Sequence, residues 1–302
     1  MTPFLNAFDV IRAIPTAKRF EIGEMLFAQF DCPVQDEPLK IWSQTDHLVH
    51  VVSARSTWKT SMGMCSAEAG ESIFFRKGAF VSPPHVEPDL CLLIFFIPDA
   101  FVREVIRELA AEIQPLSGPS ASDEVVIRLN NDTALSAFFH SMLVYFADEK
   151  PLAEALLKLK LKELLTSLLI SASNPALSAY LRSLATCDAP PLPPIMEANF
   201  CHSLPLDAFA KLCHRSLSSF KREFHRCYRT TPAKWLIKRR LECAAQMLRT
   251  TSLSILEIAL ECGFEEPSHF SRTFKSRFGR SPTDYREKEK SRADLAQLIS
   301  LR

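Results

Sequence analysis

Residues 255–286 read ILEIALECGFEEPSHFSRTFKSRFGRSPTDYR, and this stretch carries the clearest structural signal in the chain. Ser254 and Glu257 have the spacing of a capping box, which predicts a helix that begins at residue 255. Gly263 can adopt the positive φ that ends such a helix, and Pro267 suits the first turn of the next one. The pattern predicts two short helices joined by a tight turn.

The second of these helices has two different faces. Phe270, Phe274 and Phe278 follow one another at intervals of four residues, so we expect one buried face. The remaining faces are polar and partly basic, which is what the major groove of DNA accepts. The side chains that we expect to contact DNA here are Ser268, His269, Ser271, Arg272 and Lys275.

The same pattern occurs once more, 50 residues earlier, with Phe220, Phe224, Pro232 and Trp235 at the positions of Phe270, Phe274, Pro282 and Tyr285. A repeat this regular predicts two copies of one helical unit. In the first copy Ser218, Lys221 and Arg222 are the outward residues that we expect to contact DNA. His214 takes the place of Gly263, and because His tolerates positive φ less well than Gly, we expect a slightly strained turn.

Residues 235–249 join the two units, and their apolar residues predict one continuous helix with Lys238, Arg239 and Arg240 outward or flanking. A rigid connection would hold the two units at a fixed spacing. If the units lie ~34 Å apart, both can enter successive major grooves of one duplex, so a single chain would read an asymmetric site.

The charge distribution separates the chain into two parts. Residues 1–199 contain 16 Lys and Arg against 24 Asp and Glu, a net charge of −8, whereas residues 200–290 contain 18 against 10, a net charge of +8. A basic block beside an acidic one indicates a nucleic-acid partner for the basic part. Only 7 Gly are present and no GxGxxG or GxxxxGK[ST] string occurs, which argues against a nucleotide-binding enzyme.

The amino-terminal part changes character near residue 98. Short apolar or alternating runs at 20–30, 47–53, 71–76 and 90–97 predict strands of a small antiparallel barrel or sandwich. Helical periodicity follows, strongest at 98–113, 133–147 and 151–170. We therefore expect an α+β protein with a sensor and dimerisation domain at 1–188 (barrel 20–97, helices 98–185), an extended Pro-rich linker at 189–194, and an all-helical DNA-binding domain at 195–290.

One apolar seam on the predicted helix 151–170 has two interpretations. Leu157, Leu161, Leu164 and Leu168 lie on one face of that helix. The seam either packs on the core of its own domain or also pairs with a second copy of the chain, and the sequence leaves both open.

No catalytic, metal or cofactor site is expected. The nine Cys are scattered without a CxxC, and pairs such as Cys201-His202 match no zinc-finger spacing, which favours free thiols in a reducing cytoplasm. His47, His50 and His85 fall in the predicted barrel without an HxH, so structural roles are expected. We expect that the protein is not an enzyme. The alternative is a cupin-type metal enzyme that carries a DNA-binding module, and it would need three metal ligands. Neither a signal peptide nor a membrane span is expected.

The carboxy-terminal segment 195–286 resembles the AraC/XylS family of bacterial transcription regulators. The resemblance rests on Ile255-x-x-Ile258-Ala259-x-x-x-Gly263-Phe264 and on the residues from Ser268 to Lys275 and from Phe278 to Arg286. It implies two helix-turn-helix units bridged by a helix, binding to promoter DNA, and usually activation through RNA polymerase. Two departures concern the turns: His214 replaces the usual Gly, and Glu266 stands where an Asp cap is common.

The amino-terminal part, at residues 71–78 and 92–98, resembles the sensor domains of the subgroup that includes the activator of type III secretion genes. This likeness implies a cupin-like barrel followed by helices used for self-association. It also implies control by a regulatory protein or by a small-molecule effector, and aromatic side chains such as Trp58 and Phe75 could line a ligand cavity or fill the barrel. The resulting hypothesis is a dimeric, cytoplasmic activator.

Overall fold

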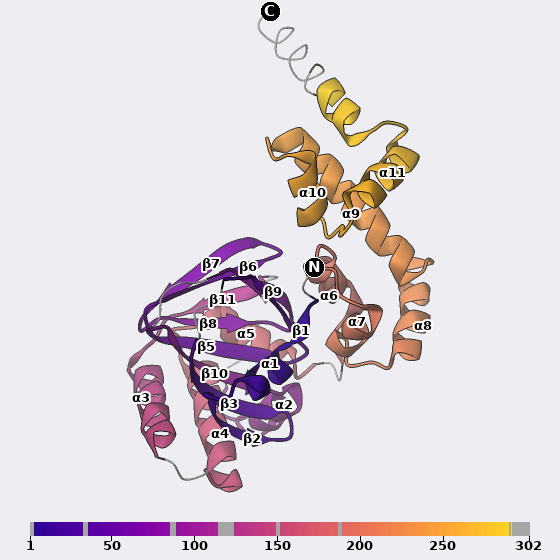
Figure 1. The fold of residues 1–302 in the computed structure, drawn as a ribbon. Helices are drawn as coiled ribbons and strands as arrows, with labels where there is room; N and C mark the ends of the chain where they lie inside the picture. The colour runs from indigo at the N-terminus through magenta and orange to yellow at the C-terminus, as the bar shows by residue number, and fades with distance from the viewer. Residues whose placement is uncertain are drawn as a thin grey trace, which may run out of the picture. The chain divides into compact units, whose positions relative to one another are not determined.

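The computed structural model describes residues 3–32, 36–84, 89–113, 124–148, 152–186, 189–289 and 291. The chain folds into two compact units. One unit comprises residues 2–195 with 211–214, and the other comprises residues 196–210 and 215–302. Figure 1 shows strands and helices in the first unit and helices alone in the second. This is the α+β class that the sequence predicts.

The strands of the first unit form two sheets. One sheet has five strands in the order β1-β4-β9-β6-β7, and the other has six in the order β11-β8-β5-β10-β3-β2. Neighbouring strands are antiparallel except for β1 and β4, which are parallel. The strands are β1 (Leu5–Asn6), β2 (Lys18–Ile22), β3 (Met25–Asp31), β4 (Leu39–Ser43), β5 (Asp46–Ser53), β6 (Arg55–Thr60), β7 (Gly63–Glu68), β8 (Ser72–Phe75), β9 (Gly78–Ser82), β10 (Cys91–Ile97) and β11 (Val126–Leu129).

The centre of the six-stranded sheet is buried on both faces, which explains why β10 is apolar without alternation. In β10, Leu93, Phe95 and Ile97 pack in the cluster that the helices cover. Leu92 and Phe96 belong to a second cluster, which lies toward the five-stranded sheet. Because successive strand residues point to opposite faces, one continuous apolar run supplies both cores.

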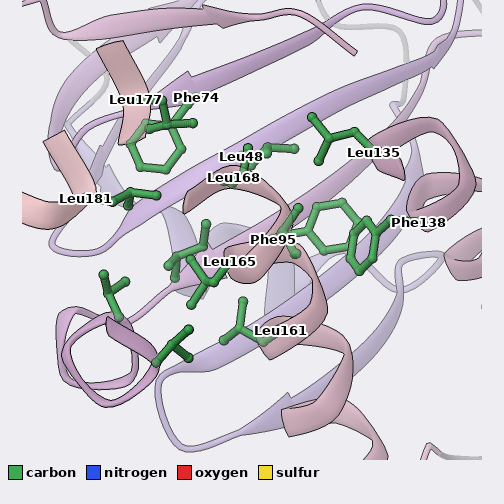
Figure 2. Packing of buried hydrophobic residues seen from close by; sticks show 14 of the residues in the cluster. Leu48, Phe74, Phe95, Leu135, Phe138, Leu161, Leu165, Leu168, Leu177 and Leu181 are labelled. Atoms are coloured by element: carbon green, nitrogen blue, oxygen red, sulfur yellow. The ribbon is translucent and has the colours of Figure 1, made fainter. Parts of the chain in front are cut away.

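Helices cover the outer face of this sheet and close the larger core (Figure 2). Leu161, Leu165 and Leu168 of α4 point at Leu48 and Phe95 of the sheet in this view. The helices of this unit are α1 (Ala7–Ala13), α2 (Asp99–Glu108), α3 (Thr133–Ala147), α4 (Glu154–Ile170) and α5 (Pro175–Ser183).

The leucine seam of α4 therefore has the intramolecular role. Leu157, Leu161, Leu164 and Leu168 are at most 1% exposed and lie in the core of their own domain. These four side chains are already buried and offer no area to a second copy, so the structure favours the first of the two interpretations, packing on the core of their own domain.

Two further expectations need correction. The segment 98–185 is not helical throughout, because β11 pairs with β8 at the edge of the sheet. The segment 189–194 is not an extended linker, because α6 (Leu192–Asn199) begins inside it with Pro193 and Pro194 in its first turn. Proline is tolerated there, since the first helical N–H groups have no partner within the helix.

A group of buried charges ties α2 and α5 to the sheets. Lys77 donates from Nζ to both carboxylate oxygens of Asp99 at 2.5 Å, and its backbone N–H donates to Asp46 at 2.7 Å. The hydroxyl of Tyr180 donates to the other oxygen of Asp46 at 2.8 Å, and burial raises the pKa of Asp46. Every hydrogen bond here joins groups that would be costly to bury alone.

Within the described residues no single helix is long and apolar enough to cross a membrane; α4 and α5 together reach that length but are bent by 115° at their break.

Candidate nucleic-acid interface

The second unit of the chain contains two helical pairs joined by one long helix. The first pair is α7 (Leu206–Leu212) and α8 (Leu217–Tyr228), and the second is α10 (Ile255–Glu261) and α11 (Pro267–Phe278). The connecting helix is α9 (Pro232–Thr250). Figure 1 shows the two pairs at opposite ends of α9.

The start of the second pair has the predicted capping box. The hydroxyl of Ser254 accepts the Glu257 N–H at 3.1 Å, and the Glu257 carboxylate accepts the Ser254 N–H at 2.7 Å. Helix α11 starts with Pro267 and has no side-chain hydrogen bond at its cap residue Glu266. Glu266, which stands where an Asp cap is common, thus makes no capping hydrogen bond.

Both turns have the same hydrogen-bond pattern. In the second pair, Phe264 N–H donates to Ala259 O at 2.9 Å and Gly263 N–H donates to Leu260 O at 3.0 Å. In the first pair, Arg215 N–H donates to Ala210 O and His214 N–H donates to Lys211 O, both at 2.9 Å. These are the two hydrogen bonds of the Schellman motif, which places positive φ at the next-to-last of its six residues.

The residues at that position differ between the two turns. Gly263 has φ +81°, and His214 has φ +53°, as the strained-turn prediction requires. A Cβ on Gly263 would lie 2.4 Å from the Cys201 carbonyl oxygen, which no side chain can accommodate without moving backbone. Gly263 is therefore required by close approach as well as by its conformation.

Phenylalanines form the buried faces of the two helical pairs, as predicted, although Phe278 is only half-buried. Phe220, Phe224, Phe270 and Phe274 are fully buried. Phe224 lies edge-on to Trp235 with ring centroids 6.0 Å apart, and Phe274 lies edge-on to Tyr285 at 5.4 Å. The repeat detected in the sequence is thus also a repeat of these aromatic contacts in the structure. These rings contribute to the core and are not platforms for single-stranded bases.

The predicted DNA-contacting residues lie on the opposite faces of α8 and α11. Those that are exposed are Ser218, Lys221, Arg222, Ser268, Arg272 and Lys275, and those that are half-buried are His269 and Ser271. His269 is partly covered because its ring lies 6.0 Å from the ring of Phe264. On each helix the predicted contact set therefore includes two exposed cations and an exposed hydroxyl, a combination that suits phosphates and base edges.

Arg240 is the main residue that the sequence interpretation misplaced. It points inward: its guanidinium donates to the carbonyl oxygens of Phe200 at 2.7 Å, His202 at 2.8 Å and Gly263 at 2.9 Å. Burial lowers its pKa from the usual value. The signal was available, because position 240 lies four residues after Leu236 and four before Ala244, both of which are buried.

Arg215 is a second internal brace that the sequence did not reveal. Its guanidinium makes a bidentate pair with Glu223, at 2.5 Å and 2.9 Å, and joins the turn of the first pair to the middle of α8. A planar fork on a carboxylate fixes orientation as well as distance. Arg215 therefore stabilises the first helical pair, α7 and α8, and does not belong to its solvent-facing side.

His47 and His50 of the amino-terminal domain cannot bind the same metal ion. His47 and His50 lie three residues apart on β5 and point to opposite faces of the sheet. His50 stacks on Phe139 of α3, whereas His47 stacks on Phe75 and Phe96 between the sheets. His85 lies outside the described residues, among which no group of three His, Cys, Asp or Glu side chains is placed to hold a metal.

Two family models match the chain. One is described as the ExsA N-terminal regulatory domain and matches residues 46–180, and the other is a helix-turn-helix domain that matches residues 209–288. The virulence regulon transcriptional activator VirF of Yersinia enterocolitica is 24% identical over 80% of this chain and 89% of its own length. The transcriptional regulator ExsA of Pseudomonas aeruginosa is 27% identical over 74% of this chain and 80% of its own.

Solved structures of related description also match. ToxT from Vibrio cholerae aligns over 87% of this chain and 98% of its own, with 11% identity and a TM-score of 0.39. The DNA-binding domain of AdpA, solved with a target DNA, aligns over 31% of this chain and 84% of its own, with 29% identity and a TM-score of 0.30.

Proposed function

The chain belongs to the AraC/XylS family of DNA-binding transcription regulators, and we propose that its two helix-turn-helix units bind one promoter site across two successive major grooves. The observation that carries this proposal is the equivalence of the two units. They have the same turn geometry and the same buried aromatic face, and the continuous helix α9 joins them. Its 19 residues span ~28 Å, which is comparable with the ~34 Å between successive major grooves.

The contacts to DNA are assigned by exposure and by residue type. Arg222 of α8 and Arg272 of α11 are the candidates for bidentate bonds to guanine, and Lys221 and Lys275 are the candidates for phosphate. Ser218, Ser268, His269 and Ser271 complete the contact set near the helix starts. The net charge of +8 over residues 200–290 supports this assignment.

The amino-terminal domain is the regulatory part. Its interior supports a protein partner over a small-molecule effector, because the space between the sheets is filled by Trp58, Phe75, Phe80 and Phe96 around the buried His47. A partner would then act on the surface of the domain. We further propose a homodimer that activates transcription through RNA polymerase in the cytoplasm, consistent with relatives that are named transcriptional activators.

The proposed DNA-binding mode is tested by changing the spacing of the two elements in the bound DNA site. Genome-wide mapping of DNA bound by the full chain should yield sequences with two short elements whose centres lie ~10 bp apart. Inserting ~5 bp between the elements places them on opposite faces of the duplex, and affinity should fall to that of a site with one element. Unchanged affinity after this insertion would refute a two-groove mode while leaving DNA binding intact.

The proposed partner is tested separately. If control is exerted by a protein, affinity purification of the full chain should recover that protein in stoichiometric amount. A small molecule that raises the melting temperature of the amino-terminal domain would instead point to an internal effector site.

A further inference from the structure

The second helix of each helix-turn-helix unit, α8 or α11, is the proposed reading helix, and the two differ in charge at their carboxyl-terminal ends. At the offset of 50 residues, Arg226 of α8 corresponds to Ser276 of α11. Arg229, which directly follows α8, corresponds to Gly279. Both arginines are exposed. The first unit therefore carries two cations that the equivalent positions of the second unit lack.

The two arginines continue the face of α8 that carries the proposed DNA contacts. Arg222, Arg226 and Arg229 follow one another at intervals of four and three residues, which places them on one side of a helix. The backbone N–H of Arg229 donates to the His225 carbonyl oxygen at 2.9 Å, so Arg229 keeps the helical position one turn after His225. Phe224 lies on the opposite side of the helix and is buried.

Neither arginine is used within the part of the chain that the structure describes. There the side chains of Arg226 and Arg229 make no hydrogen bond and no ion pair. The single carboxylate of α8, Glu223, is held by Arg215 in a bidentate pair. Both guanidinium groups are therefore available to an anion outside the chain.

Arg229 also has a backbone conformation that an arginine rarely adopts. Its φ is +52°, in the left-handed region, and Gly279 at the equivalent position has φ +74°. The left-handed conformation costs free energy for a residue with a Cβ, whereas Gly adopts it readily. Since α11 ends with Gly, this turn of the fold does not require a side chain. Strain at an exposed arginine without an internal contact points to a functional role.

We propose that Arg226 and Arg229 bind phosphates of the DNA backbone beside the major groove that α8 enters, and that the strain at Arg229 is retained for this contact. The inference rests on the proposed function of α8 as a reading helix. DNA is the polyanion that the position favours, because the two arginines extend the row of cations that begins with Lys221 and Arg222. The first unit then makes two phosphate contacts for which the second unit has no equivalent.

Binding of the full chain to a promoter duplex at several salt concentrations tests these contacts. Arg226→Ala and Arg229→Gly should each reduce the slope of log K against log salt by ~0.9 and lower the affinity ~5-fold at ~0.15 M salt, the effect of one lost phosphate contact. The loss should be the same on base-substituted duplexes, because phosphates carry no sequence information. Arg229→Lys keeps the positive charge and should retain most of the affinity. Fluorescence anisotropy measures all of these quantities.

Thermal stability separates a functional role of Arg229 from a structural one. Arg229→Gly should raise the melting temperature of the DNA-binding domain by ~2–6 °C, because Gly relieves the left-handed strain, while DNA binding weakens. Damage to the fold cannot explain a variant that is more stable and binds DNA less tightly. Lys238→Gln removes one charge from an exposed lysine of α9, 3.9 Å from Glu242, and as the control it should stay close to the parent chain in both measurements.

Two outcomes would overturn the proposal. One is an unchanged salt slope in both arginine variants. The other is a melting temperature of Arg229→Gly below that of the parent chain, which would give Arg229 a role in the fold. In both cases the parent chain still binds its promoter duplex, so the proposed function stands. If the parent chain binds no duplex at any salt concentration, the proposed function fails and the inference fails with it.

Discussion

Arg240 donates from its guanidinium to the carbonyl oxygen of Gly263 at 2.9 Å, so a side chain in the middle of the connecting helix holds the turn of the second helix-turn-helix unit. The same guanidinium bonds to the carbonyl oxygens of Phe200 and His202, which precede the first unit. One half-buried cation thus fixes three segments that are distant in sequence. The relative placement of the two proposed reading helices depends on this contact, although Arg240 itself is not proposed to contact DNA.

Replacing Arg240 should therefore destabilise the domain and weaken DNA binding together. Arg240→Gln removes bonds from a charged donor to three carbonyl groups, each worth ~1.5–3 kcal/mol, and we expect a net loss of ~3 kcal/mol in the free energy of unfolding. Arg240→Lys should lose nearly as much, because one ammonium cannot reproduce a planar fork. Urea unfolding followed by circular dichroism measures the loss.

Lys238→Gln is the matched control, since this exposed lysine of the same helix lies 3.9 Å from Glu242 and should contribute less than ~0.5 kcal/mol. A stability of Arg240→Gln within error of this control would show that the three carbonyl groups are satisfied without the guanidinium.

Gly263→Ala tests the close approach of two backbone segments. The new Cβ would lie 2.4 Å from the Cys201 carbonyl oxygen, and the backbone would have to move. Gly279, which ends α11 at φ +74°, provides the control because nothing lies within 4 Å of a Cβ placed there. We expect Gly279→Ala to cost ~1–2 kcal/mol for its left-handed conformation and Gly263→Ala to cost at least ~2 kcal/mol more. Equal losses of thermal stability in the two variants would contradict the steric argument.

The DNA-binding half could be predicted in detail because its signals are local. A capping box, a positive-φ turn and phenylalanines at helical spacing each specify structure within a few residues, and the repeat doubles the evidence from the turn and the phenylalanines. The two turns and the four buried phenylalanines were predicted correctly for this reason. Arg240 was misplaced because charge was weighted above helical position.

The amino-terminal half was harder because its pairings are distant in sequence. Strand β11 is separated from its partner β8 by about fifty residues, and its four residues carry no pattern that distinguishes a strand from a loop. Strands β4, β6, β7 and β9 are also short, and none of them was predicted. The helix 133–147 was predicted with both ends because a long apolar segment at helical spacing needs no distant partner to be recognised.

Arg272 and Lys275 should differ in what their loss does to DNA binding. If Arg272 bonds to a guanine, Arg272→Ala should cost ~1–3 kcal/mol of binding free energy on the preferred site and should relax the preference at one base pair. If Lys275 contacts phosphate, Lys275→Ala should weaken all sequences alike and reduce the slope of log K against log salt by ~1. Anisotropy titrations on base-substituted duplexes at several salt concentrations distinguish the two effects. An unchanged site preference in Arg272→Ala would count against base contact.

Acid should destabilise the amino-terminal domain through His47. This ring is buried between Phe75 and Phe96, and burial lowers its pKa to about 4. In the unfolded chain the ordinary pKa is ~6.5, so the unfolded state takes up the proton first as the pH falls. The stability that the neutral ring gives is fully present above pH ~6.5 and is lost as the pH falls toward 4, at a cost of ~3 kcal/mol.

His47→Phe keeps an aromatic ring in this place but cannot titrate, so its free energy of unfolding should fall less steeply between pH 6.5 and 4. Part of the slope should remain, because burial also lowers the pKa of His50 to about 4. His140→Gln, at an exposed histidine of α3, should follow the parent chain at every pH. Urea unfolding of the three proteins at half-unit pH intervals makes the comparison. Parallel curves for His47→Phe and the parent chain would mean that His47 takes up its proton in the folded domain as readily as in the unfolded chain.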